Sequence, residues 1–171
     1  PAVLGDRKPG EYSVLNHDPE EIDRGKALDL PELVFPAWQT AILRHGSGAE
    51  STVLALPFNP PGGHRHADDL SLYYFDRGQA ILGDQGYVGD TPMNGWIHST
   101  LSHNLVVVDG GGQSPSEKGP SLRIMVTSPR LSVVEAESDS YAQCSEYRRL
   151  VVLVKGPGAA TFAVDVFRCL L

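Results

Sequence analysis

Short apolar or alternating runs, separated by turn-forming residues, fill the chain from about residue 32 onward. Val, Ile, Leu, Phe and Tyr dominate these runs, and Gly, Pro, Asn, Asp and Ser separate them, which is typical of β-strands. No window shows the apolar stripe with a 3.6-residue period that a surface helix needs. The predicted strands are Glu32–Phe35, Trp38–His45, Ser51–Leu56, Asp69–Asp76, Gln79–Gly83, His103–Val108, Leu122–Thr127, Leu131–Glu137, Glu146–Lys155 and Thr161–Arg168.

The segments between these runs indicate an all-β, antiparallel β-sandwich. Arg77-Gly78 and Gly156-Pro157-Gly158 have the composition of hairpin turns. Long Gly- and Pro-rich crossings at 57–64 and 109–121 favour two packed sheets over a closed barrel. We interpret residues 1–30 as an irregular, linker-like segment and 31–171 as the sandwich. The last run stops inside a strand, so we expect the domain to be incomplete at its C-terminus and the chain to be part of a larger protein.

Composition narrows the class of protein. With 171 residues, 41% of them hydrophobic, one well-filled domain is expected. The 14 basic and 21 acidic residues argue against the basic face of a nucleic-acid binder. No apolar run has the length of a membrane span. Cys144 and Cys169 fall in separate predicted strands; two free thiols are favoured, and a disulfide stays open.

The candidate chemistry lies between residues 64 and 103, where four of the six histidines fall. If the segment around His64 is extended, residues 64, 66 and 68 share one face. Asp84 follows one apolar run and His103 opens another, so both lie at predicted strand ends. Two imidazoles and a carboxylate form a ligand set for zinc or a similar divalent ion. By spacing alone, a solvated His-x-His pair on a strand remains the simpler interpretation.

Three ordered blocks resemble the heparinase II/III domain, whose family includes heparan sulfate lyases and alginate or oligoalginate lyases. The first block is His-x-His-x-Asp-x-Leu-Ser at 64–71, and the second is Leu-x-Asp-x-Gly at 82–86. The third is His103-Asn104, followed by an apolar run that ends at Asp109-Gly110. The three blocks together, over residues 62–110, are much more specific than any one of them.

The resemblance implies a fold and an activity. Proteins of this family join an N-terminal α/α toroid to a C-terminal, supersandwich-like β-sandwich, and they cleave uronate-containing polysaccharides by β-elimination. The toroid and its catalytic Tyr would lie outside this chain, so the chain alone is expected to have little or no lyase activity. The resemblance also implies an acidic poly- or oligosaccharide substrate and a periplasmic or secreted location.

The resemblance assigns roles by motif position. His66, Asp84 and His103 match metal ligands, usually of zinc, and His64 matches a catalytic histidine facing the substrate. Asp68 and Asn104 are expected behind the ligands, Asp68 orienting an imidazole and Asn104 capping or holding the His103 backbone. Arg65 departs from a small residue common in the family, and Tyr87 and Trp96 fit a packing role as well as a binding one. The expected substrate-binding residues are Arg65, Tyr87, Trp96 and His98.

Other interpretations remain open at this stage. A metal-dependent, cupin-like enzyme would also use a His-x-His pair and a later His. A non-catalytic carbohydrate-binding module with a structural metal is a third possibility. We interpret Tyr73, Tyr74 and Phe75 as ordinary strand residues, and Arg148-Arg149 as a solvated strand face.

Overall fold

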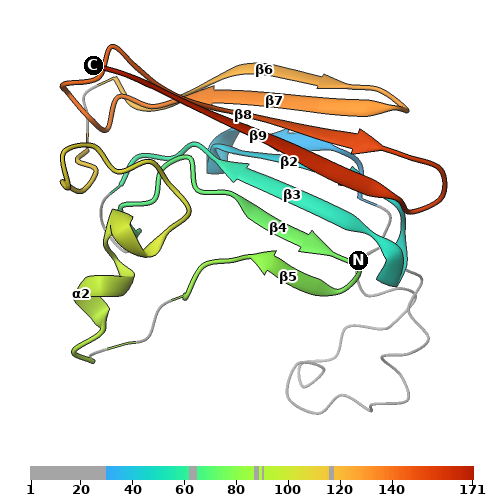
Figure 1. The fold of residues 1–171 in the computed structure, drawn as a ribbon, viewed down its shortest axis with the longest axis horizontal. Helices are drawn as coiled ribbons and strands as arrows, with labels where there is room; N and C mark the ends of the chain where they lie inside the picture. The colour runs from blue at the N-terminus through green and yellow to red at the C-terminus, as the bar shows by residue number, and fades with distance from the viewer. Residues whose placement is uncertain (1–29, 62–64, 87–88, 90, 116–117) are drawn as a thin grey trace. The chain divides into compact units, whose positions relative to one another are not determined.

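The computed structural model describes residues 30–61, 65–86, 89, 91–115 and 118–171. Within these residues, nine antiparallel strands form two sheets, one with the order β1-β2-β3-β4-β5 and the other β6-β7-β8-β9 (Figure 1). Two-sheet, all-β architecture confirms the predicted fold class. The strands are β1 (Leu33–Phe35), β2 (Thr40–His45), β3 (Thr52–Pro57), β4 (Tyr73–Asp76), β5 (Gln79–Leu82), β6 (Ser121–Thr127), β7 (Leu131–Glu137), β8 (Glu146–Lys155) and β9 (Thr161–Leu170).

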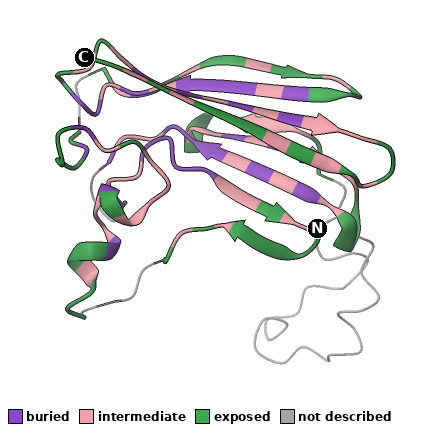
Figure 2. Ribbon diagram, viewed as in Figure 1, coloured by how far each residue is buried: buried purple, intermediate pink, exposed green. Residues whose placement is uncertain are grey.

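Alternation along the strands explains how the sheets pack. In β8, every second residue from Tyr147 to Leu153 is buried, and Thr52, Leu54 and Leu56 are buried in the same way in β3. Successive side chains of a strand point to opposite faces, so each sheet turns one apolar face inward. Figure 2 shows these alternating buried positions on both sheets. Buried side chains of both sheets join in one hydrophobic core.

Short helical turns complete the fold. They are η2 (Pro36–Trp38), η3 (Gly48–Glu50), α2 (Asn94–Ile97) and η4 (Thr100–Ser102). None of the helices in the described part of the chain is long and apolar enough to cross a membrane.

Both predicted hairpins are present. Arg77 and Gly78 both have positive φ, 47° and 74°, between the paired residues Asp76 and Gln79, as the tight turn of a two-residue hairpin requires. The segment around Gly158 joins β8 to β9.

Two expectations about the connections were wrong. The segment His103–Val108 is not a strand; its one ladder contact is an isolated bridge from Val108 to Gly111. The segment 57–64 does not begin a crossing between the sheets, because the chain after β3 returns to pair β4 with β3. Residues after β5 do pass to the second sheet. Neighbouring strands run in opposite directions, so β3 and β5 end at the same end of the first sheet. The connection from β3 to β4 and the segment after β5 therefore both start there.

Candidate metal centre

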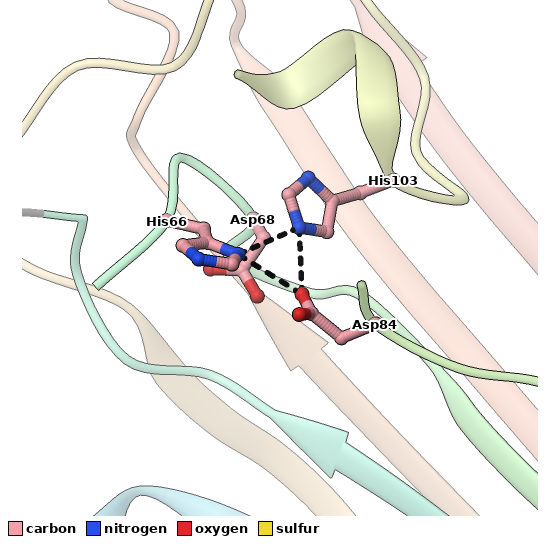
Figure 3. Close-up of side chains that lie close together, drawn as sticks. All are labelled: His66, Asp68, Asp84 and His103. Carbon is pink, nitrogen blue, oxygen red and sulfur yellow. Dashed lines mark hydrogen bonds and ion pairs between the residues drawn. The ribbon is translucent and has the colours of Figure 1, made fainter. Parts of the chain in front are cut away.

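Three side chains far apart in the sequence meet at this end of the first sheet. His66 lies between β3 and β4, Asp84 follows β5, and His103 follows η4. The Oδ2 atom of Asp84 lies 3.0 Å from His66 Nδ1 and 2.8 Å from His103 Nε2. The two ring nitrogens are 3.1 Å apart. Figure 3 shows the three groups converging, with Asp68 beside His66.

Burying these side chains costs free energy of folding unless their charges are compensated. The side chains of His66, Asp84 and His103 are 9%, 13% and 2% exposed. Buried polar and charged groups are retained where hydrogen bonds, ion pairs or metals satisfy them. Burial alone would raise the pKa of Asp84, but hydrogen bonds from the Gly86 amide, His103 and His66 outweigh it, so this pKa lies below its usual range. Asp84 therefore carries a negative charge at neutral pH.

The environment of His103 selects one ring nitrogen for a cation. His103 Nδ1 lies 2.8 Å from the carbonyl oxygen of Ser99, which only accepts hydrogen bonds, so Nδ1 must donate a proton there. Nε2 can then donate to Asp84 only when both ring nitrogens carry a proton; in the neutral ring Nε2 carries a lone pair, which faces Asp84 and is available to a cation. A backbone carbonyl that fixes the tautomer in this way is the usual support of a metal-binding imidazole.

The spacing of the donor atoms fits a small divalent ion. Tetrahedral zinc with bonds of 2.0–2.1 Å separates its ligand atoms by about 3.3 Å. The three separations here, 2.8, 3.0 and 3.1 Å, are slightly shorter, so a small outward movement would accommodate an ion. His66, Asp68, Asp84 and His103 form a group that could hold a metal, with one ligand atom from each within 4.8 Å of the others.

Asp68 is the fourth member of this group. Burial raises the pKa of Asp68, although His103 and His66 act in the opposite direction. The Tyr73 hydroxyl donates to Asp68 Oδ2 at 3.4 Å, and burial raises the pKa of Tyr73 as well. Asp68 thus lies next to the three converging groups, where it is available either as a ligand or as a support.

A pocket of about 290 Å³ lies beside the cluster. Tyr73 lines it, which sequence reasoning missed: a Tyr at the first position of a strand looks like any other strand residue. Arg65 also lines the pocket and is exposed, donating to the carbonyl of Pro60 at 3.3 Å. The complete lining is Pro57, Asn59, Arg65, His66, Asp68, Tyr73, Asp84 and Gly86.

The other predicted site residues do not all lie at the cluster. The His98 ring lies edge-on to the His66 ring, with centroids 4.4 Å apart, so His98 joins the cluster. Trp96 is half exposed on α2. His64 and Tyr87 lie outside the described residues. Their catalytic and substrate-binding roles, and the ligand roles above, stay predictions.

Asn104 and Arg149 are placed differently from what the sequence suggested. The Asn104 side chain pairs with the backbone of Leu72 rather than with that of His103. The Arg149 side chain is 3% exposed, so its interpretation as part of a solvated strand face was wrong. Arg149 occupies an inward position on β8, in the same alternation as Tyr147 and Val151.

Cys144 and Cys169 are free thiols, as favoured from the sequence. Their sulfur atoms lie 3.6 Å apart. Burial raises the pKa of the Cys144 thiol to about 11, so it is a poor nucleophile at neutral pH.

The fold and the site define a class: an antiparallel β-sandwich protein with a candidate metal centre at one end of a sheet. Comparison with known proteins identifies the family within this class. The family model described as heparinase II/III-like, C-terminal, matches residues 29–170. The chain therefore belongs to the heparinase II/III-like C-terminal domain family. A search of curated proteins gives no match.

Solved structures agree on the fold. A crystal structure of heparinase III superposes with a TM-score of 0.70 at 19% identity over 85% of this chain. Heparan sulfate lyase HepC from Pedobacter heparinus gives 0.68 at 21% identity, also over 85% of this chain. The heparinase III-BT4657 gene product gives 0.68 at 20% identity, again over 85%. This chain spans 23% of the first two structures and 24% of the third.

Proposed function

We propose that this chain is the β-sandwich part of a polysaccharide lyase that cleaves uronate-containing chains by β-elimination. The observation that carries the proposal is the meeting of His66, Asp84 and His103 in a member of this family. One of the similar structures is a heparan sulfate lyase, which supports an acidic polysaccharide as the substrate class. Since this chain spans 23% of that structure, most of the substrate site would come from another part of the protein.

In this proposal, the metal is zinc or another divalent ion, bound by His66, Asp84 and His103. It would supply positive charge and a rigid link between the loops that carry its ligands. Asp68 is a further carboxylate beside these three ligands, and the Nδ1–H of His103 donates to the Ser99 carbonyl oxygen.

The pocket beside the cluster would receive part of the sugar chain. β-Elimination removes the proton next to the uronate carboxylate, so negative charge grows on that carboxylate and must be stabilised. Arg65 is exposed at the pocket and offers a cation for it, and an arginine can hold a carboxylate through two parallel hydrogen bonds. His64, His98, Tyr87 and Trp96 are proposed to contact the sugar as well, His64 as the histidine that takes part in catalysis.

An activity assay tests the proposal. The 171-residue chain and a longer form of the protein that extends upstream of Pro1 are incubated with heparan sulfate and with alginate. Ultraviolet absorbance of the unsaturated uronate product is then followed. We expect turnover by the longer form on one of these polymers and little or none by the chain alone.

Matched variants of the longer form connect the activity to the site. Asp84→Asn should lower kcat/KM at least tenfold, because the carboxylate that joins the two histidines is lost. Asp109→Asn is the control: Asp109 is exposed and has a φ of 53°, which Asn tolerates. Equal activities of the two variants, or a longer form inactive on every uronate polymer, would contradict the lyase assignment.

The two other candidate functions are a cupin-like enzyme and a carbohydrate-binding module. A cupin-like enzyme needs ligands inside a closed barrel, whereas here two open sheets pack together and the ligands lie on connecting segments. A carbohydrate-binding module shares the fold, and binding of a polymer by the longer form without cleavage would favour it.

A further inference from the structure

Arg149 is a buried cation that the proposed chemistry does not use. It lies on β8, where its Cα neighbours are Ala136 on β7 and Phe167 on β9. Its side chain is 3% exposed and its guanidinium carbon lies 5.5 Å from the centre of the Phe167 ring. A charge buried this deeply in a sandwich core is retained only where its hydrogen bonds are made.

One side of the guanidinium is held by β9. Arg149 Nε donates to Asp165 Oδ1 at 2.9 Å, and Nη2 donates to Asp165 Oδ2 at 2.7 Å. This two-bond pairing fixes the plane of the guanidinium relative to the second sheet.

The other side of the guanidinium reaches the two connections that carry the candidate ligands. Arg149 Nη1 donates at 2.8 Å to the carbonyl of Leu70, four residues after His66. The same nitrogen lies 2.8 Å from both the carbonyl and the side-chain oxygen of Asn104, the residue after His103. One nitrogen atom thus joins a segment between β3 and β4 to a segment after η4.

The Asn104 side chain adds two more hydrogen bonds between these two segments. Its Oδ1 accepts from the Leu72 amide at 2.9 Å and its Nδ2 donates to the Leu72 carbonyl at 3.0 Å. Leu70 itself has a φ of 68°, a left-handed conformation that costs energy for a residue with a side chain. The hydrogen bond from Arg149 to the Leu70 carbonyl holds this unusual backbone in place.

We infer that Arg149 is a positioning residue, which locks the His66 and His103 segments to the second sheet so that the two imidazoles meet. Its role in metal affinity rests on the proposed function, whereas the placement of the two rings does not. Lysine cannot replace it, because a single ammonium cannot reach the Asp165 carboxylate, Leu70 and Asn104 in a fixed plane.

The test compares two substitutions of neighbouring inward residues on β8. Arg149→Lys keeps the charge and removes the planar fork. Val151→Ala is the control, because Val151 is fully buried in the same core and its aliphatic side chain makes no hydrogen bond to either segment. A third variant, Asp165→Asn, weakens the fork from its half-exposed side and is used in the same way if Arg149→Lys does not fold.

Two readouts are recorded on the full chain. The first is the nuclear Overhauser contact between the His66 and His103 rings without metal, whose centroids lie 5.2 Å apart. The second is the Zn²⁺ dissociation constant by calorimetry. Arg149→Lys should lose the ring contact and bind Zn²⁺ about 10- to 100-fold more weakly, as loss of a support behind the ligands does. Val151→Ala should keep both, despite a lower Tm.

The outcomes distinguish the positioning role of Arg149 from the proposed metal site. If Arg149→Lys keeps the ring contact, or if Val151→Ala loses it to the same extent, Arg149 has no positioning role. If the unaltered chain does not bind Zn²⁺ while the ring contact still depends on Arg149, the proposed metal site is wrong and the positioning role stands.

Discussion

Asp69 shows how single residues around the centre are stabilised. It follows Asp68 and is fully buried, and its backbone amide and carbonyl pair with the side chain of Gln113 at 2.7 and 2.8 Å. Its carboxyl group receives the Ser140 hydroxyl at 3.3 Å. Burial raises the pKa of Asp69 to about 7, so the group is protonated in the folded protein in mildly acidic solution.

This pKa gives a testable pH dependence. The pKa of Asp69 rises from 3.8 to about 7 on folding, so its protonated form stabilises the fold fully below about pH 4. That contribution is lost as the pH rises through about 7, by about 4 kcal/mol at most, since each pKa unit corresponds to about 1.4 kcal/mol.

Asp69→Asn should flatten the pH dependence of the unfolding free energy between about pH 4 and about pH 7, as measured by urea denaturation. Asp109→Asn, at an exposed position, should keep the slope of the unaltered protein. An Asp69→Asn profile parallel to the unaltered one would show that Asp69 is ionised throughout.

At the scale of elements, the centre is built on connecting segments rather than on strands. Carbonyls along 103–106 accept hydrogen bonds from side chains of β8: Arg149 binds that of Asn104, and the Tyr147 hydroxyl binds that of Val106 at 2.6 Å. These side-chain donors replace the partners that a neighbouring strand would supply, and every buried backbone group needs some partner. The apolar run at 103–108 therefore packs against the core without becoming a strand.

The hairpin before Asp84 offers a prediction at the same scale. Gly78 has a φ of 74° and an added Cβ would meet no atom within 4 Å, so Gly78→Ala introduces backbone strain alone. We expect a loss of about 1 kcal/mol in unfolding free energy by chemical denaturation.

Gly83 provides the matched control, because an added Cβ there also meets nothing within 4 Å and its φ is not positive. Gly83→Ala should leave stability unchanged or slightly higher. Equal destabilisation by both substitutions would show that the left-handed turn is not what fixes this hairpin.

At the scale of the whole molecule, the centre joins both sheets. The candidate ligands lie on segments that extend from the first sheet. Arg149 on the second sheet, paired with Asp165, forms hydrogen bonds to these segments. A ligand that binds only this arrangement must stabilise the entire sandwich, because the separated segments of the unfolded chain cannot form the site.

Zinc should therefore raise the thermal stability of the chain. At a free concentration 100-fold above the dissociation constant, the unfolding free energy should increase by about 2.7 kcal/mol, and a chelator should remove the increase. Differential scanning calorimetry with and without zinc measures it.

Asp84→Asn should abolish most of this stabilisation, whereas His45→Ala, which removes a histidine bonded to the Gly158 carbonyl away from the cluster, should keep it. A Tm that zinc does not change in the unaltered chain would contradict the proposed metal centre.

The sequence predicted the strands well where local pattern decides them. β7 and β8 begin and end where the alternating runs do, and the positive φ of Gly78 agrees with its Arg-Gly turn. The motif blocks also selected His66, Asp84 and His103, which the structure brings within hydrogen-bond distance of one another. Tyr73 was missed because nothing in a strand pattern marks the one residue that faces a pocket.

What the sequence determined by itself is the period-two alternation, the turns and the residue types available to a metal, because each depends on neighbours along the chain. The tertiary structure alone decided that Arg149 is buried and that the His103–Val108 run is not a strand. Both results depend on partners as distant as Leu70 and Asp165, and hydrogen bonds between such segments exist only after the two sheets have packed.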